Sequence, residues 1–159
     1  MVNLSHLGTY QPNPGNDSCI ACPLGYECNS TSHAICEPGT ISGVGEMTCV
    51  SCSVGTYQTE SGNDTCLPCP LGHECNTSSA TICQPGTISS EGEMSCVTCS
   101  VGTYQTESGN DTCLPCPLGH ECNTSSATIC QPGTISSEGE MSCVTCPEGN
   151  PPEALCSSS

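Results

Sequence analysis

The sequence contains no lysine, arginine, phenylalanine or tryptophan. Its 16 acidic residues therefore have no basic counterpart, and the formal net charge at pH 7 is −16. Nucleic-acid binding depends on Lys and Arg side chains that displace phosphate counterions, and anionic lipid surfaces attract the same side chains. We therefore expect no nucleic-acid partner and no docking on an anionic membrane.

Large aliphatic residues are also scarce. Leu, Ile and Val together account for only 22 of the 159 residues, and no stretch approaches the roughly 20 apolar residues of a membrane span. We expect no direct insertion into a membrane. Because so few apolar residues cannot form an ordinary core, the chain must either be disordered or be held together by covalent links.

Cysteine is the residue that the sequence has in excess, with 19 copies. This density in a short chain is typical of secreted domains, in which disulfides replace a hydrophobic core. The cysteines therefore predict an oxidising location, extracellular or at the cell surface, and a small disulfide-rich fold.

The cysteines follow a period of 47 residues. Residues 53–99 and 100–146 are identical, and residues 6–52 match 53–99 at 29 of 47 positions, every cysteine included. A fixed period of this length is the signature of a repeat architecture. We divide the chain into repeat 1 (1–52, with an incomplete first loop), repeat 2 (53–99), repeat 3 (100–146) and a C-terminal cap and tail (147–159).

Each period contains a weaker half-repeat, in which C-x-x-G-T and an apolar residue are followed by a polar stretch and then by C-x-x-C. The Thr and apolar pair suits a short strand, and the glycines suit tight turns. Amphipathic helical periodicity is absent. The expected fold is an elongated rod of tandem repeats made of short β-hairpins and loops, with little or no helix.

The odd number of cysteines leaves at least one without a partner inside the chain. The repeat predicts the disulfides Cys52–Cys66 and Cys99–Cys113, and at the C-terminal end Cys146–Cys156. The equivalent partner of Cys19 would be residue 5, which is a serine. We therefore predict that Cys19 is unpaired or forms an intermolecular disulfide.

The spacing Cys52-x13-Cys66-x2-Cys69-x5-Cys75-x7-Cys83-x12-Cys96-x2-Cys99, with its C-P-L-G and C-x-P-G-T pieces, resembles the cysteine-rich modules of tumour necrosis factor receptors and the related ephrin-receptor-like repeats. The receptor pairing, carried over, implies six further disulfides: Cys22–Cys36, Cys28–Cys49, Cys69–Cys83, Cys75–Cys96, Cys116–Cys130 and Cys122–Cys143. The half-repeat suggests another set, with Cys83–Cys96 by analogy with Cys52–Cys66 and with Cys69–Cys75 remaining. Both sets leave Cys19 over.

Seven Asn-x-Ser/Thr sequons are present, and six of them occupy two equivalent positions in each period. In a secreted chain such sequons are acceptors for N-linked glycans. The predicted glycosylation sites are Asn3, Asn16, Asn29, Asn63, Asn76, Asn110 and Asn123.

The sequence gives little support for a more specific chemical role. Two C-x-x-C pairs, Cys49/Cys52 and Cys66/Cys69, are near the spacing of a zinc ribbon, but Cys75 and Cys83 would then have no role. A thiol oxidoreductase lacks its βαβ context, and acidic turns such as Glu91-Gly-Glu93 lack the pattern of a calcium loop. We expect no catalytic residues, no metal and no cofactor.

The predicted function is that of a non-enzymatic, glycosylated structural protein, a repeat rod of an extracellular filament, coat or stalk. An open first loop and a capped last one favour head-to-tail self-association, since a heterologous contact need not close. The alternative is a receptor-like or surface-antigen module that binds a protein ligand. Because repeat 1 alone diverges, residues 9–47 would then carry the binding surface.

Overall fold

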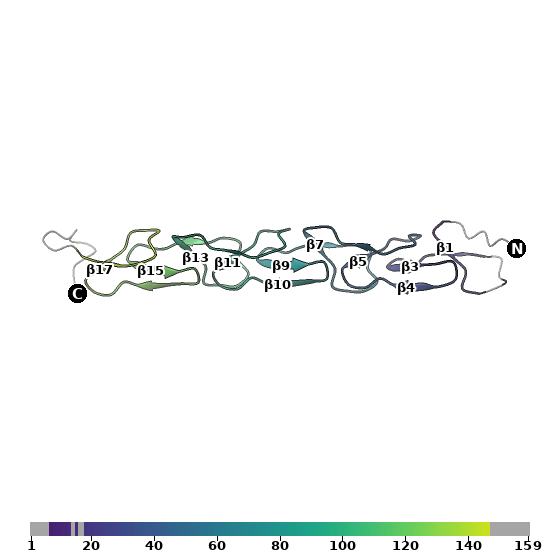
Figure 1. Cartoon of the computed structure of the whole chain (residues 1–159), viewed down its shortest axis with the longest axis horizontal. Helices are drawn as coiled ribbons and strands as arrows, with labels where there is room; N and C mark the ends of the chain where they lie inside the picture. The colour runs from purple at the N-terminus through teal and green to yellow at the C-terminus, as the bar shows by residue number, and fades with distance from the viewer. Residues whose placement is uncertain (1–6, 14, 16–17, 147–159) are drawn as a thin grey trace. The chain divides into compact units, whose positions relative to one another are not determined.

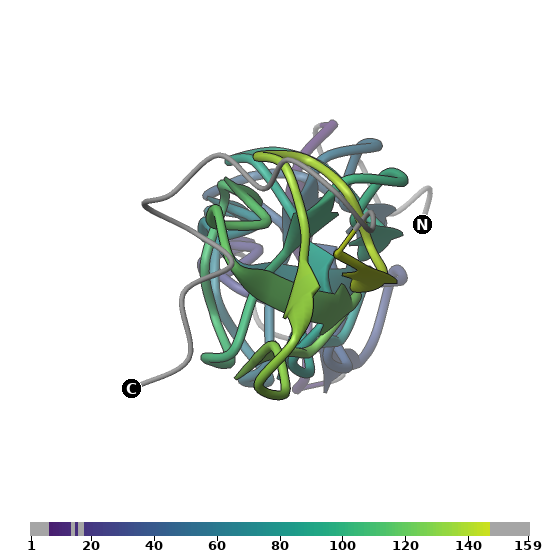
Figure 2. The same cartoon turned by 90° about the vertical axis from the view of Figure 1, so that its left-hand side faces the viewer.

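The computed structural model describes residues 7–13, 15 and 18–146, which form short strands and no helix. The strands are β1 (Thr9–Tyr10), β2 (Ile20–Ala21), β3 (Tyr26–Cys28), β4 (His33–Ile35), β5 (Thr40–Ile41), β6 (Val50–Ser51), β7 (Thr56–Tyr57), β8 (Leu67–Pro68), β9 (His73–Asn76), β10 (Ser79–Ile82), β11 (Thr87–Ile88), β12 (Val97–Thr98), β13 (Thr103–Tyr104), β14 (Leu114–Pro115), β15 (His120–Asn123), β16 (Ser126–Ile129), β17 (Thr134–Ile135) and β18 (Val144–Thr145). They pair as two-stranded sheets, each made of consecutive strands (Figure 1; Figure 2). The predicted small disulfide-rich fold of short antiparallel hairpins is confirmed.

Three hairpin types recur in each period. The A hairpins are β1–β2, β7–β8 and β13–β14; the B hairpins are β3–β4, β9–β10 and β15–β16; the C hairpins are β5–β6, β11–β12 and β17–β18. The A and C hairpins follow the two C-x-x-G-T half-repeats. The B hairpin lies between them, over residues for which the sequence pattern predicted only loops and hairpins in general.

The described residues belong to two compact units. One holds the residues up to Pro70 together with Cys75–Thr81, and the other holds Leu71–Glu74 together with the residues from Ile82 onward. The division falls inside repeat 2, so the units of packing differ from the units of the sequence repeat. Within each unit, hairpins pack on their neighbours in the chain, as expected for a repeat protein.

A glycine turn starts each hairpin. In the C hairpin of repeat 1, Thr40 N donates to Glu37 O at 3.1 Å across Pro38 and Gly39, and Gly39 has a φ of 88°. A turn with a positive φ at its third position requires glycine, and proline suits the position before it. The hairpin closes where Cys52 N donates to Gly39 O at 2.9 Å. The pairing in between is short, with Thr40 opposite Ser51 and Ile41 opposite Val50.

Every described disulfide joins two cysteines that are consecutive among the cysteines of the chain. The predicted bonds Cys52–Cys66 and Cys99–Cys113 are present, and Cys146 is disulfide-bonded, although its predicted partner Cys156 lies outside the described residues. The other six described disulfides are Cys22–Cys28, Cys36–Cys49, Cys69–Cys75, Cys83–Cys96, Cys116–Cys122 and Cys130–Cys143.

The pairing implied by the receptor resemblance is therefore wrong. Cys22–Cys36, Cys28–Cys49, Cys69–Cys83, Cys75–Cys96, Cys116–Cys130 and Cys122–Cys143 do not form. A disulfide requires Cα atoms about 4.4–6.8 Å apart, and the local turns bring consecutive cysteines to such a distance. The Cα separation is 5.9 Å for Cys22–Cys28 and 5.7 Å for Cys36–Cys49. The alternative set suggested by the half-repeat is the one that occurs.

The core consists mainly of sulfur and backbone. Cys22 and Cys69 are fully buried, whereas Val54 is 92% exposed. Gln58 and Ser42 are also buried, and every buried side-chain nitrogen or oxygen of the described residues has a hydrogen-bond partner. The disulfides thus take the place of the aliphatic core that the composition excludes.

Candidate functional site

Consecutive hairpins are joined through their backbones. Between the C hairpin of repeat 1 and the A hairpin of repeat 2, Gly39 N donates to Gln58 O at 2.8 Å and Gly62 N donates to Cys36 O at 2.9 Å. The same junction recurs between β11–β12 and β13–β14, where Gly86 N donates to Gln105 O at 2.8 Å. Because backbone groups make these bonds, any hairpin that keeps its glycines can form the same junction.

Within each unit, glycines also let a hairpin approach the next hairpin but one. A Cβ atom on Gly25 would lie 1.9 Å from Gly62 O, and one on Gly72 would lie 2.0 Å from Gly109 O. No side chain fits at such distances, so only glycine permits these contacts. Ile35 and Ile82 flank the same contacts, and their Cδ1 atoms approach Gly62 and Gly109 respectively. We call the junction and these glycine contacts together the stacking interface.

No described residue covers the side of the last C hairpin, β17–β18, that corresponds to the stacking interface. Gly133 is exposed, although its equivalents Gly39 and Gly86 are buried. Ile129 is 69% exposed, compared with 45% for Ile82. No described atom lies within 4 Å of a Cβ built on Gly119 or on Gly133.

The sequons of the B hairpins lie in exposed turns. Asn76 is exposed, and its Oδ1 accepts hydrogen bonds from Ser78 N at 2.9 Å and Ser78 Oγ at 3.1 Å. In repeat 3, Asn123 Oδ1 is held by Ser125 in the same way, at 2.8 and 3.1 Å. In repeat 1, Asn29 Oδ1 accepts from Thr31 N at 2.9 Å. The sequon hydroxyl is therefore already beside the acceptor asparagine.

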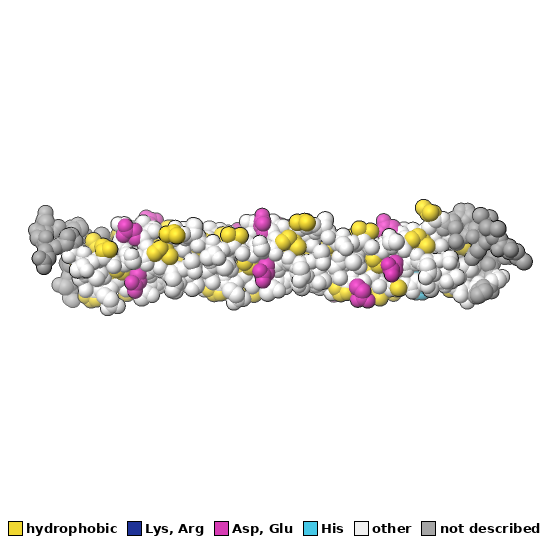
Figure 3. Space-filling model, in the orientation of Figure 1, with side chains coloured by type: hydrophobic (Ala, Val, Ile, Leu, Met, Phe, Trp, Pro, Cys, Tyr) yellow, Lys and Arg dark blue, Asp and Glu magenta, His cyan; other side chains and the backbone are white. Residues whose placement is uncertain are grey.

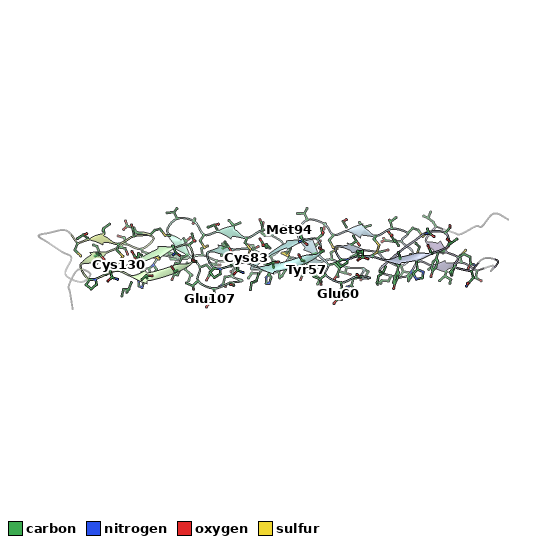
Figure 4. All side chains as sticks on the ribbon, turned by 60° about the horizontal axis from the view of Figure 1, so that its bottom comes forward. Tyr57, Glu60, Cys83, Met94, Glu107 and Cys130 are labelled. Atoms are coloured by element: carbon green, nitrogen blue, oxygen red, sulfur yellow. A yellow bond between two sulfur atoms is a disulfide. The ribbon has the colours of Figure 1, made fainter. Side chains whose placement is uncertain are left out.

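The sequons of the A hairpins have different surroundings. Asn63 is half-buried, and its backbone oxygen accepts a hydrogen bond from Ser42 N at 3.3 Å, within the stacking interface. The sequon hydroxyl, Thr65 Oγ1, donates to Asp64 Oδ1 at 3.0 Å and not to the asparagine. Neighbouring Glu60 points outward, as does Glu107 in repeat 3 (Figure 4). Asn3 and Asn16, the other two predicted sites, lie outside the described residues.

Cys19 is the free cysteine of the described residues, as the repeat predicted, and it is partly exposed. Its equivalents Cys66 and Cys113 form disulfides with Cys52 and Cys99. The surrounding hairpin is nonetheless formed, because Tyr10 pairs with Ile20 in β1–β2 as Tyr57 pairs with Leu67 in β7–β8.

Repeat 1 has an aromatic cluster that the other repeats lack. The His33 ring lies 5.1 Å from the Tyr10 ring and 5.2 Å from the Tyr26 ring. The residues equivalent to His33 and Tyr26 in repeat 2 are an alanine and a histidine. A depression of about 200 Å³, lined by residues that include His33, Asn29 and Met47, lies beside the cluster.

Metal chemistry finds no support among the described residues, where no group of three or more His, Cys, Asp or Glu side chains is placed to hold an ion. The cysteines that the zinc hypothesis would use are engaged in disulfides. On the face seen in Figure 3, acidic and apolar side chains are scattered over a mainly polar surface. No helix of the described residues is long and apolar enough to cross a membrane.

The stacking glycines are the residues that sequence reasoning missed. Five glycine positions with positive φ recur in every period, although repeat 1 differs from repeat 2 at many others; they are Gly8/Gly55/Gly102, Gly15/Gly62/Gly109, Gly25/Gly72/Gly119, Gly39/Gly86/Gly133 and Gly45/Gly92/Gly139. Glycine retained within divergent repeats was the available signal, because it indicates a turn or a close approach of backbones.

Comparison with known proteins identifies the repeats. A search of curated proteins finds no match to the chain. A family model described as "Tyrosine-protein kinase ephrin type A/B receptor-like" matches residues 39–83 and 86–131, which is more than half of the 159 residues. The disulfides and this match together indicate cysteine-rich modules of an extracellular type. The chain therefore belongs to the ephrin-receptor-like family of cysteine-rich repeats.

Proposed function

We propose that this protein is a non-enzymatic structural element of an extracellular filament, coat or stalk, and that copies associate head to tail. The observation that carries the proposal is the stacking interface, which is built from backbone groups and glycines and recurs with the same geometry. A repeat protein of this kind can be extended by adding units without a new interface.

A second copy of the chain has the hairpin that the uncovered face requires. Among the described residues, an A hairpin follows the C hairpins β5–β6 and β11–β12, and the first described hairpin, β1–β2, is an A hairpin. Its Gly15 is equivalent to Gly62 and Gly109, is exposed, and has a φ of 90°. Stacking Gly15 of a second copy over Gly119 and Ile129 would repeat the contact that Gly109 makes with Gly72 and Ile82.

Light scattering coupled to size-exclusion chromatography tests this proposal on the oxidised chain over a range of concentrations. We expect the mass to rise with concentration in multiples of the monomer. Ile129→Glu places a charge on the uncovered face and should abolish the rise. The matched control is Val144→Glu. Val144 is 54% exposed, and its equivalent Val97 is 60% exposed although another hairpin follows it, so stacking does not bury this position.

A monodisperse monomer at every concentration would overturn the head-to-tail proposal. An equal effect of Ile129→Glu and Val144→Glu would also overturn it, since the loss would then reflect added charge alone. The intact mass before and after reduction reports on Cys19. A reducible dimer that Cys19→Ser removes would show that this cysteine joins chains.

A second candidate function is a receptor-like module that binds a protein ligand, as in the alternative reading of the sequence. The aromatic cluster of Tyr10, Tyr26 and His33 favours it, since the described residues contain such a cluster once. A partner captured by the intact chain should then be lost on His33→Ala, while the matched change His120→Ala in repeat 3 should have no effect. Equal retention by both variants would argue against this candidate.

A further inference from the structure

The two classes of sequon differ in how the structure presents the acceptor asparagine. B-hairpin sequons, at Asn29, Asn76 and Asn123, lie in exposed turns, and A-loop sequons, at Asn63 and Asn110, lie in half-buried loops. We propose that N-glycans are attached selectively to the B-hairpin sequons and that the A-loop sequons remain largely unmodified. This inference rests on the extracellular route of the proposed function, but not on self-association.

Glycan transfer makes a defined demand on the sequon. The asparagine Nδ2 forms a bond to the anomeric carbon of a lipid-diphosphate-linked oligosaccharide, the carbon–oxygen bond to the diphosphate breaks, and the diphosphate leaves with the electron pair. Nδ2 releases one proton to a base. An acceptor therefore needs an accessible Nδ2 with the sequon hydroxyl available close to it.

The B-hairpin sequons meet this demand. The Oδ1 atoms of Asn76 and Asn123 accept the hydrogen bonds from the sequon serines, so the Nδ2 atom is the remaining group of each amide. No described residue accepts a hydrogen bond from Nδ2 at Asn76 or Asn123, and both side chains are exposed. In repeat 1, Thr31 Oγ1 also lies 3.3 Å from Asn29 Oδ1.

The A-loop sequons fail on two counts. Their hydroxyls are bonded to the acidic residue at the middle of the sequon, with Thr65 Oγ1 on Asp64 Oδ1 at 3.0 Å and Thr112 Oγ1 on Asp111 Oδ1 at 2.9 Å. Because this contact joins adjacent residues, it is available before the chain folds as well as after.

The A loop is also held from outside. Ser89 N donates to Asn110 O at 3.3 Å, and Gly109 N donates to Cys83 O at 3.0 Å. The backbone on both sides of Gly109 is thereby fixed in the stacking interface. A glycosylating enzyme would have to displace a neighbouring hairpin to draw this loop into its active site, whereas the B-hairpin asparagine is exposed.

The sequence allows a direct measurement. The chain secreted from eukaryotic cells is deglycosylated enzymatically in ¹⁸O water, which converts each glycosylated asparagine to labelled aspartate, and is then reduced and cleaved after glutamate. Cleavage at Glu60, Glu74 and Glu91 separates Asn63 from Asn76. Repeat 3 gives peptides of identical sequence, so one peptide reports Asn63 with Asn110 and another reports Asn76 with Asn123, while Asn29 lies in a peptide of its own, residues 28–37. We expect label at the B-hairpin sites at least about fivefold above the A-loop sites.

Two variants test the cause. Asp64→Ser with Asp111→Ser frees the sequon hydroxyls and should raise the label at Asn63 and Asn110 severalfold. The matched change Ser30→Asp introduces the acidic residue into an exposed B-hairpin sequon and should lower the label at Asn29.

Equal labelling of the two classes in the unmodified chain would overturn the inference. Unchanged A-loop labelling in the double Asp variant would overturn the part played by the hydroxyl contact. A secreted chain with no label at any peptide would also overturn the inference, while leaving head-to-tail association, which light scattering measures separately, unaffected.

Discussion

Two C hairpins of identical sequence, β11–β12 and β17–β18, differ in what covers them. Gly86 and Cys83 are buried in the first, whereas Gly133 is exposed and Cys130 half-buried in the second. Because the two hairpins share every residue, the difference in burial follows from their surroundings: the A hairpin β13–β14 comes after the first, and no described hairpin comes after the second. The comparison shows that burial in this fold is a property of the stack and not of the single hairpin.

Among the changes that test this comparison, removing the disulfide of a C hairpin should have the largest effect on stability. Each disulfide joins cysteines 13 positions apart, and its removal should lower the free energy of unfolding by about 3 kcal/mol. The two double variants are Cys83→Ser with Cys96→Ser and Cys130→Ser with Cys143→Ser. The internal pair should cost more, since Cys83 is buried under the next hairpin. Chemical denaturation followed by circular dichroism measures both, and equal costs would contradict the role of the stack.

Alanine in place of a stacking glycine should also destabilise a covered hairpin more than the last described one. Gly72 and Gly119 have similar φ values of 69° and 74°, so alanine at either position costs about 1–2 kcal/mol in backbone strain. A Cβ on Gly72 would also lie 2.0 Å from Gly109 O, while no described atom is near Gly119. We expect Gly72→Ala to be the more destabilising by about 1–3 kcal/mol, measured by hydrogen exchange of the neighbouring amides.

The smallest expected difference is between Ile82→Ala and Ile129→Ala. Ile82 is 45% exposed and packs near Gly109, and Ile129 is 69% exposed. Truncation should cost about 1 kcal/mol at Ile82 and less at Ile129. The midpoint of thermal unfolding measures this, and a larger loss at Ile129 would mean that its surface is covered in solution.

Much of the fold was predictable from the sequence because cysteines and glycines recur at fixed positions and mark its turns. The C-x-x-G-T half-repeats predicted the A and C hairpins, and the unmatched Ser5 identified Cys19 as the odd cysteine. The pairing Cys69–Cys75 was only one of two open alternatives. Pairing depends on which Cα atoms come within disulfide distance, and the B hairpin, whose first strand contains Cys75, left little pattern in its sequence.

The candidate sites divide in the same way. The sequons could be found from the sequence, but the contrast between Asn76 and Asn63 could not, because it depends on which backbone carbonyl a neighbouring hairpin engages. The importance of Gly25 and Gly72 was likewise not predicted, since their contacts are made with residues 37 positions later.

The sequence by itself determined the repeat, the disulfide-rich class, the hairpin turns and the odd cysteine, because each follows from local spacing or from counting. The tertiary structure alone decided which of the two open disulfide sets forms, the stacking interface and the exposure of each sequon. These depend on distances between hairpins, and such distances arise only when glycines allow one backbone to approach another.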